Sequence, residues 1–170
     1  MKNISHLNLF IDSLIHPKKL AAYRILSIGK VIQYTFLLVA LVTAFSLGQF
    51  VNNGADSIFG YEEIQAYIAD LKWLIYIVSA LFLFIMNTLI VYAKISVYAY
   101  VGYLLAKPAS RRVEYRHMWR TAAFAITWEI LLSLVFSTIQ LSGTTSTLIS
   151  IFLTMFIIIV ALTKYPTLKK

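Results

Sequence analysis

The sequence contains no cysteine and little charge. Without cysteine there is no disulfide scaffold, no thiolate nucleophile and no metal site with cysteine ligands. Charged residues make up 13% of the chain, against about 25% in soluble domains. A water-soluble surface needs more charge than this, so the composition argues against a soluble fold.

Enzyme signatures are also missing. The sequence holds no Gly-rich phosphate loop, no His-Glu-x-x-His and no Gly-x-Ser-x-Gly motif. The three histidines, His6, His16 and His117, are scattered and lack the spacing of metal ligands. We therefore predict a protein that is not an enzyme and that uses no metal and no cofactor.

Hydrophobic residues make up 60% of the chain, against about 45–50% in soluble domains. They gather in four runs that can each cross a bilayer, which takes about 20 mostly apolar residues. Backbone amides in hydrocarbon must bond internally, so each run should be a helix. The sequence predicts an all-α membrane protein with a single membrane domain, residues 1–170. The expected segments are interfacial helices at 1–30, spanning helices at 31–51, 73–93 (continuing to about 106), 121–140 and 146–163, a short outer loop at 52–72, a basic inner loop at 107–120 and a tail at 164–170.

The charges are distributed unevenly between the two sides of these spans. Fourteen of the fifteen basic residues fall in 1–30, 94–120 and 164–170, which lie on one side. The segment 52–72 carries four acidic residues and one basic residue, Lys72. Positive charge marks the cytoplasmic side, so both termini are expected in the cytoplasm. Since topology accounts for the basic charge, no nucleic-acid partner is predicted.

The segment before the first span has two expected helices. Its first half has apolar residues at helical spacing, which predicts an amphipathic helix in the cytoplasmic interface. Pro17 suits the first turn of a second helix. In that helix Lys18, Lys19 and Arg24 are expected to contact anionic lipid headgroups. The apolar positions of the first helix are Leu7, Phe10, Ile11, Leu14 and Ile15.

Two loops also have features of their own. In the outer loop the apolar residues from 61 to 71 share one helix face, which predicts a short surface helix. In the inner loop the basic residues after Pro108 adopt a spacing of four, typical of a helix. This basic helix either binds lipid headgroups or docks a cytoplasmic partner. Its basic residues are Arg111, Arg112, Arg116 and Arg120.

Glu129 lies near the middle of the third span, where an ionisable group is costly and marks a candidate functional position. Ser133, Ser137 and Gln140 follow at about one-turn intervals and complete a polar seam. A polar seam should face other helices rather than lipid. It either forms a proton, cation or substrate site, or it serves only to fix helix packing.

Lys94 interrupts the second apolar run, and Asn87 lies two turns earlier on the same face. Two interpretations of Lys94 stay open. Its amine either pairs with Glu129, or its long stem snorkels to the cytoplasmic surface. We favour snorkelling, because Lys94 follows Trp73 by about one membrane thickness.

Two stretches of the sequence resemble a known family. The first comprises Ser13-Leu14-Ile15-His16-Pro17-Lys18-Lys19, Tyr23-Arg24, Ile28-Gly29-Lys30 and Gln33-Tyr34, and the second is Arg112 to Thr127 with Tyr115-Arg116, Trp119-Arg120 and Ala125-Ile126-Thr127. They resemble uncharacterised membrane proteins of Gram-positive bacteria, catalogued as a domain of unknown function, some labelled maltodextrin-utilisation proteins and distantly similar to Yip1-type proteins. The resemblance implies a bacterial plasma membrane and no catalytic residues. Those proteins usually carry a long extracytoplasmic segment between the first two spans, and here only residues 52–72 separate them.

Short loops leave little room for a soluble site, which favours a non-enzymatic accessory or scaffold subunit of a larger membrane complex. The alternative is a small oligomeric transporter, channel or lipid-handling protein that uses the polar seam around Glu129. The expected partners are the bilayer, anionic headgroups and either a larger membrane protein or further copies of this chain.

Overall fold

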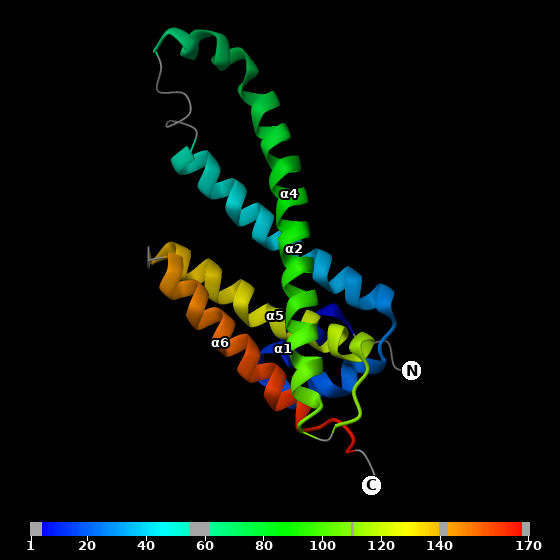
Figure 1. Ribbon diagram of the computed structural model, residues 1–170. Coiled ribbons are helices and arrows are strands. Elements are labelled where there is room, and N and C mark those ends of the chain that lie inside the picture. Colours follow the sequence, from blue (N-terminus) through cyan, green and yellow to red (C-terminus); the bar gives the residue numbers. More distant parts are fainter. Residues whose placement is uncertain (1–4, 55–61, 110, 140–142, 168–170) are drawn as a thin grey trace. The chain divides into compact units, whose positions relative to one another are not determined.

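The computed structural model describes residues 5–54, 62–109, 111–139 and 143–167 (Figure 1). In these residues the secondary structure is helical, apart from one isolated bridge between Arg111 and Thr167. Four of the described helices are long and apolar enough to cross a membrane, which confirms the predicted all-α membrane fold. The elements are α1 (His6–Ile15), η1 (Pro17–Ile25), α2 (Ile28–Gln49), η2 (Phe50–Gly54), α4 (Glu62–Ala106), α5 (Tyr115–Thr138) and α6 (Gly143–Leu162).

The chain divides into two compact units. One unit contains Met1–Leu38 and Tyr92–Lys170, and the other contains Val39–Val91. In the second unit the side-chain amide of Asn87 donates a hydrogen bond to the Thr43 hydroxyl at 3.2 Å. The first unit holds the sites described below.

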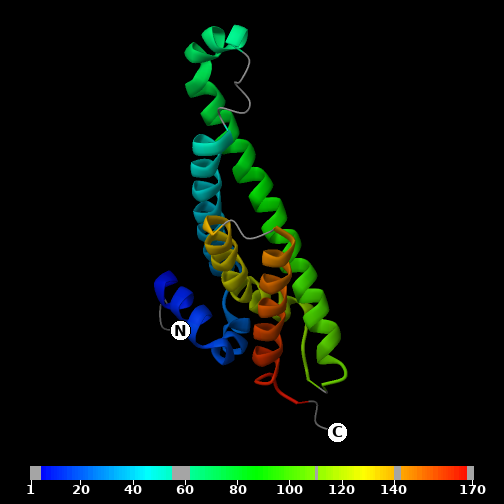
Figure 2. The same ribbon diagram turned by 90° about the vertical axis from the view of Figure 1, so that its left-hand side faces the viewer.

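Helix α5 is the centre of the first unit. Its residues from Thr121 to Thr127 are all buried, so the helix is covered on every side over nearly two turns. Three of these residues are alanines, and small side chains let neighbouring helices approach closely. Helix α5 packs against α6, η1 and α1, and Figures 1 and 2 show α5 and α6 side by side.

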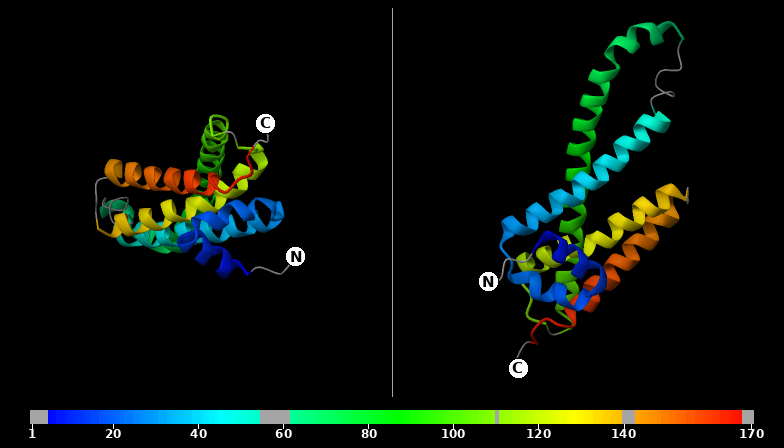
Figure 3. Two further views of the ribbon diagram at one scale, coloured as in Figure 1. Left: turned by 90° about the horizontal axis from the view of Figure 1, so that it is seen from below. Right: turned by 180° about the vertical axis from the view of Figure 1, so that it is seen from behind.

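The amphipathic N-terminal helix is present as α1, which packs against α5 and η1 (Figure 3). Its predicted apolar face is open, with Leu7 72% and Ile15 66% exposed. Ser13, which is not one of these apolar positions, is buried and donates to the carbonyl of Leu9. Packing on α5 covers the Ser13 side of α1 and leaves the apolar stripe exposed. Pro17 begins the second helix as expected, in the tighter 3₁₀ form.

Helix α4 is longer than the sequence pattern predicts. The expected surface helix at 61–71 is not a separate element, since α4 runs without interruption from Glu62 to Ala106; residue 61 lies outside the described residues. Nothing in this stretch breaks a helix, because it contains no proline. Near its end, Gly102 lies where an added Cβ would be 2.9 Å from Met118 Sδ and 3.0 Å from Ile158 Cγ2. This glycine lets α4 approach α5 and α6.

Helix α5 begins at Tyr115, six residues before the expected start at 121. The inner loop is therefore shorter than 107–120. Two of its residues pair with the tail after α6. Arg111 forms the bridge with Thr167, and the Arg112 amide donates to the Pro166 carbonyl at 2.9 Å. These backbone bonds fix both segments at the end of the bundle.

Candidate functional site

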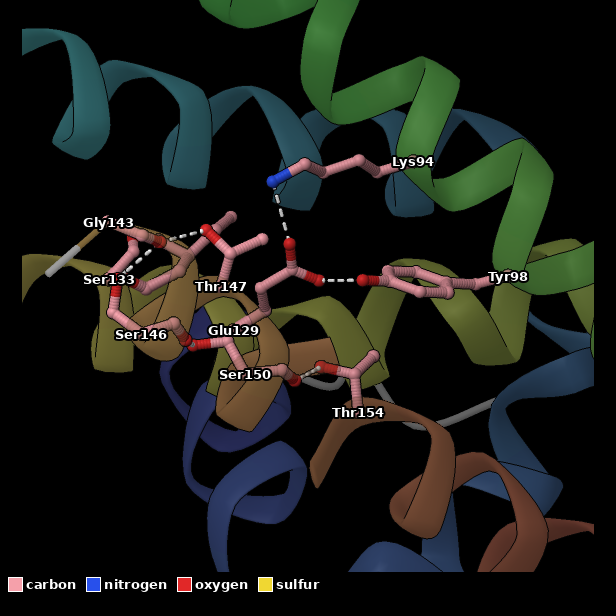
Figure 4. A network of polar contacts seen from close by, with 10 residues as sticks. Lys94, Tyr98, Glu129, Ser133, Gly143, Ser146, Thr147, Ser150 and Thr154 are labelled. Atoms are coloured by element: carbon pink, nitrogen blue, oxygen red, sulfur yellow. Dashed lines mark hydrogen bonds and ion pairs between the residues drawn. The ribbon is translucent and has the colours of Figure 1, made fainter. Parts of the chain in front are cut away.

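An ion pair joins α4 to α5 within the first unit (Figure 4). The Lys94 amine lies 2.7 Å from Glu129 Oε1, and the Tyr98 hydroxyl donates to Glu129 Oε2. Lys94 and Tyr98 are four residues apart on α4, so they lie one turn apart on one face. Both carboxylate oxygens of Glu129 therefore have a donor.

The expected snorkelling of Lys94 is wrong, because its amine pairs with Glu129. The Glu129 side chain is only 5% exposed, and the Lys94 side chain is 44% exposed. An unpaired buried carboxylate costs several kcal/mol, roughly 3–5 when its partner is removed. The flexible lysine stem reaches this carboxylate instead of the surface.

Among the described residues, the predicted polar seam is not buried beyond Glu129. Ser133 and Ser137 are exposed, contrary to the expectation that they face other helices. The Ser133 hydroxyl donates to the backbone carbonyl of Ile130. At 3.6 residues per turn, each step of four residues rotates the side chain by about 40°, which moves these serines away from the Glu129 direction. Gln140 lies outside the described residues, and Asn87 belongs to the other compact unit.

An apolar groove lies beside the ion pair and was missed by the sequence analysis. It is a cavity of about 390 Å³ between α4 and α6, and both Lys94 and Tyr98 form part of its wall. The signal that could have found it is the spacing of four between Ala93, Val97 and Val101, which share one face of α4. The groove is lined by Ala93, Lys94, Val97, Tyr98, Val101, Ile151 and Met155.

Small hydroxyl residues on α6 were also missed. Ser150 and Thr154 are buried, and each donates to a carbonyl one turn earlier, of Ser146 and Ser150 respectively (Figure 4). Hydroxyls bonded to their own helix leave no open donor and allow close packing. We therefore assign them to packing within the first unit.

Three of the predicted basic residues, Arg24, Arg111 and Arg120, join segments at one end of the first unit. The Arg120 guanidinium donates to the carbonyl of Arg24 at 2.7 Å. Arg111 donates to the carbonyl of Tyr165 at 2.6 Å, and the Arg24 guanidinium lies over the Tyr165 ring. By contrast, Arg112 and Arg116 are exposed, and Arg116 pairs with the neighbouring Glu114.

A second cavity brings Lys18, Lys19 and Arg24 of η1 together with Lys164, which follows α6. Its volume is about 400 Å³, and Ala21 and Ala22 complete its lining. Lys164 was not among the predicted contact residues. Sequence reasoning could not find it, because only the packing of η1 on α6 brings the two segments together.

Asp12 connects α1 to η1. Its carboxylate lies 2.9 Å from the Lys19 amine and accepts a hydrogen bond from Tyr23, and His16 Nδ1 is 3.1 Å away. Partial burial raises the pKa of Asp12, but the hydrogen bonds from Tyr23 and Lys19 outweigh it and hold the pKa below its ordinary value. Burial and the neighbouring Asp12 charge raise the pKa of Tyr23. Within the described part of the chain, no three His, Cys, Asp or Glu residues gather as metal ligands.

Comparison with known proteins gives one match. Residues 52–162 match the family model described as "Protein of unknown function (DUF1189)". This region includes Arg112 to Thr127, the second stretch that carries the resemblance, while residues 13–34 precede it. No curated protein and no solved structure matches the chain. Because the match spans more than half of its length, the chain belongs to the DUF1189 family of proteins of unknown function.

Proposed function

We propose that this protein is a non-enzymatic accessory or scaffold subunit of a larger bacterial membrane complex. In this proposal the groove between α4 and α6 receives an apolar transmembrane helix of the partner. The observation that carries it is the closed Lys94–Glu129–Tyr98 arrangement at the wall of an apolar groove.

The ion pair has the features of a brace. Lys94 and Tyr98 each donate to one oxygen of Glu129, so the carboxylate is already paired with a cation from α4 and with a second donor from the same helix. Within the first unit Ser133, the next residue of the predicted seam, is exposed and donates to the carbonyl of Ile130 rather than to Glu129. A brace that joins α4 to α5 also fixes the groove wall that α4 provides.

The groove has the features of a helix-packing surface. Transmembrane helices associate through close van der Waals packing, which small residues at the contact favour. Ala93 is such a small residue, and Val97 and Val101 continue the apolar face of α4 beside it, with Val97 59% exposed. On the other wall Ile151 and Met155 are apolar, and methionine adapts its shape to a partner.

We further propose that both termini lie in the cytoplasm and that the membrane is a bacterial plasma membrane. The positive-inside distribution of the basic residues supports the orientation. The resemblance to membrane proteins of Gram-positive bacteria supports the assignment to a bacterial plasma membrane.

The docking proposal is tested by photocrosslinking in the native membrane. A benzophenone side chain at Val97 should crosslink to one larger membrane protein that also co-purifies stoichiometrically. The control places the same group at Phe156, which is exposed on α6 outside the groove, and should give lipid adducts only. Ala93→Trp, which fills the groove, should abolish both the crosslink and the co-purification.

The other outcomes are equally informative. Lipid adducts alone at Val97 would contradict the proposal, because the groove would then be filled by acyl chains. A crosslink to a second copy of this chain would instead support the alternative of a small oligomeric transporter, channel or lipid-handling protein.

A further inference from the structure

The basic cavity at the end of the bundle combines charge, shape and position. Three of its cations, Lys18, Lys19 and Arg24, come from η1, and the fourth, Lys164, comes from the segment after α6. The small side chains of Ala21 and Ala22 leave room between them. The cavity of about 400 Å³ falls within the range of ligand sites, roughly 300–1,000 Å³.

The cavity carries more positive charge than the surrounding carboxylates neutralise. Lys19 is paired with Asp12 at 2.9 Å. For Lys18, Arg24 and Lys164, the described residues provide no acidic partner within ion-pair distance. Like charges that converge without a counter-ion repel one another, so an anion in the cavity would stabilise the folded protein.

Arg24 is held in place for such an anion. Its guanidinium lies 4.9 Å from the centre of the Tyr165 ring, and Arg120 fixes its backbone carbonyl. Tyr165 is itself buried, and its hydroxyl is 2.6 Å from Thr121 Oγ1. A pre-positioned guanidinium and flexible lysine amines together match the geometry and charge of a phosphate group.

The position of the cavity favours the membrane interface. It is formed by η1, which follows directly after α1. Helix α1 leaves Leu7, Ile11 and Ile15 exposed along one stripe, the arrangement of a helix that lies in the headgroup layer. Phosphates of lipid headgroups are present in that layer at high density.

We propose that the cavity formed by Lys18, Arg24 and Lys164 is a binding site for a phosphate group, supplied by the headgroup of an anionic phospholipid or by inorganic phosphate. This site is independent of the groove between α4 and α6. A phosphate group bound in this cavity would contact both η1 and the segment after α6.

The test measures binding to the full-length protein purified in an uncharged detergent. The probes are short-chain phosphatidylglycerol, short-chain phosphatidylcholine and inorganic phosphate, each titrated by calorimetry. Two variants address the cavity. Lys18→Gln with Lys164→Gln removes two charges for which no ion pair is found in the described structure, and Ala22→Leu fills the space without changing charge.

The matched control is Lys30→Gln with Lys107→Gln, which removes the same charge from residues outside the cavity. We expect phosphatidylglycerol to bind at least about tenfold more tightly than phosphatidylcholine. Both cavity variants should weaken this binding by about tenfold or more, whereas the control should change it less than about threefold. Unchanged thermal unfolding of each variant without ligand shows that the fold is retained.

The probes distinguish the sources of the phosphate. Binding of phosphatidylglycerol alone identifies a lipid headgroup, binding of inorganic phosphate alone identifies free phosphate, and binding of both with the same loss in the cavity variants identifies the phosphate group itself. The proposal is overturned if neither phosphatidylglycerol nor inorganic phosphate binds, or if the control variant weakens binding as much as the cavity variants do.

Discussion

The guanidinium of Arg24 lies over the ring of Tyr165, 4.9 Å from its centroid. This contact joins η1, near the start of the chain, to the segment that follows α6. The hydroxyl of the same tyrosine bonds Thr121 at 2.6 Å and the carbonyl of His117 at 3.2 Å, so α5 is included as well. One buried aromatic residue thus connects three elements and forms the support of the basic cavity.

Tyr165 should be a principal source of stability at this end of the bundle. Tyr165→Phe keeps the ring under Arg24 and removes two hydrogen bonds, which should cost about 1–2 kcal/mol. Tyr165→Ala removes the ring as well and should cost roughly 3–5 kcal/mol. Reversible unfolding in detergent measures both values, and equal losses for the two variants would show that the ring contributes nothing.

The ion pair should behave as a structural brace when its two residues are replaced together. Glu129→Leu alone leaves a lysine without its counter-ion and should destabilise the protein by roughly 3–5 kcal/mol. The double variant Lys94→Leu with Glu129→Leu should recover most of this loss, because replacing both charges removes the desolvation cost. A double-mutant cycle of unfolding free energies measures the coupling. Purely additive losses would contradict the brace.

Gly102 should tolerate no larger side chain. Gly102→Ala places a Cβ within 3.0 Å of Ile158 and closer still to Met118, and overpacking of this kind costs about 1–3 kcal/mol. The matched control is Gly48→Ala, since nothing lies within 4 Å of that position. The control should be neutral or slightly stabilising in helix α2. A loss at Gly48 equal to that at Gly102 would rule out close helix approach as the cause.

The junction of α1 and η1 should weaken in acid. The folded pKa of Asp12 is below its ordinary value of 3.8, so its contribution to stability is fully present above pH 3.8 and is lost as the pH falls through the lower folded value. At neutral pH Asp12→Asn should cost roughly 1–2 kcal/mol. The stabilities of wild type and variant should therefore converge below pH 3.8 in acid-dependent unfolding. A constant difference across this range would exclude Asp12 as the titrating group.

The absence of native cysteine makes the proposed orientation directly measurable. Ser27 precedes the first span and Thr144 lies at the start of the fourth, and both are exposed. With both termini in the cytoplasm, an impermeant maleimide should label Thr144→Cys in intact cells and Ser27→Cys only after lysis. Labelling of Ser27→Cys in intact cells, with Thr144→Cys labelled only after lysis, would show the opposite orientation.

Much of the architecture could be read from local sequence. The helix that contains the second span ends at Ala106, as the apolar run and the following Pro108 predict. The start of α5 was harder to predict, since Arg116 and Arg120 belong to its first turns rather than to a loop. Basic residues at a helix end look alike in sequence whether they lie in the helix or before it.

The candidate site was only partly predictable. Glu129 could be singled out because a charge within an apolar span is rare and costly. Its partner Lys94 could not be identified, since a lysine stem is long enough to reach either the surface or a neighbouring helix. Only the packing of α4 against α5 brings the Lys94 amine to Glu129. Ser133, four residues further along α5, is turned by about 40° from Glu129 and is exposed.

By itself the sequence determined the helical membrane fold, because hydrocarbon leaves a backbone no partner but its own helix. It also predicted the orientation, through the basic residues that remain on one side. Only the tertiary structure decided which side chains meet. The groove beside Lys94 and the cavity that adds Lys164 to Lys18 both arise from helices packed at close range, and close packing depends on shapes from distant segments that no local pattern contains.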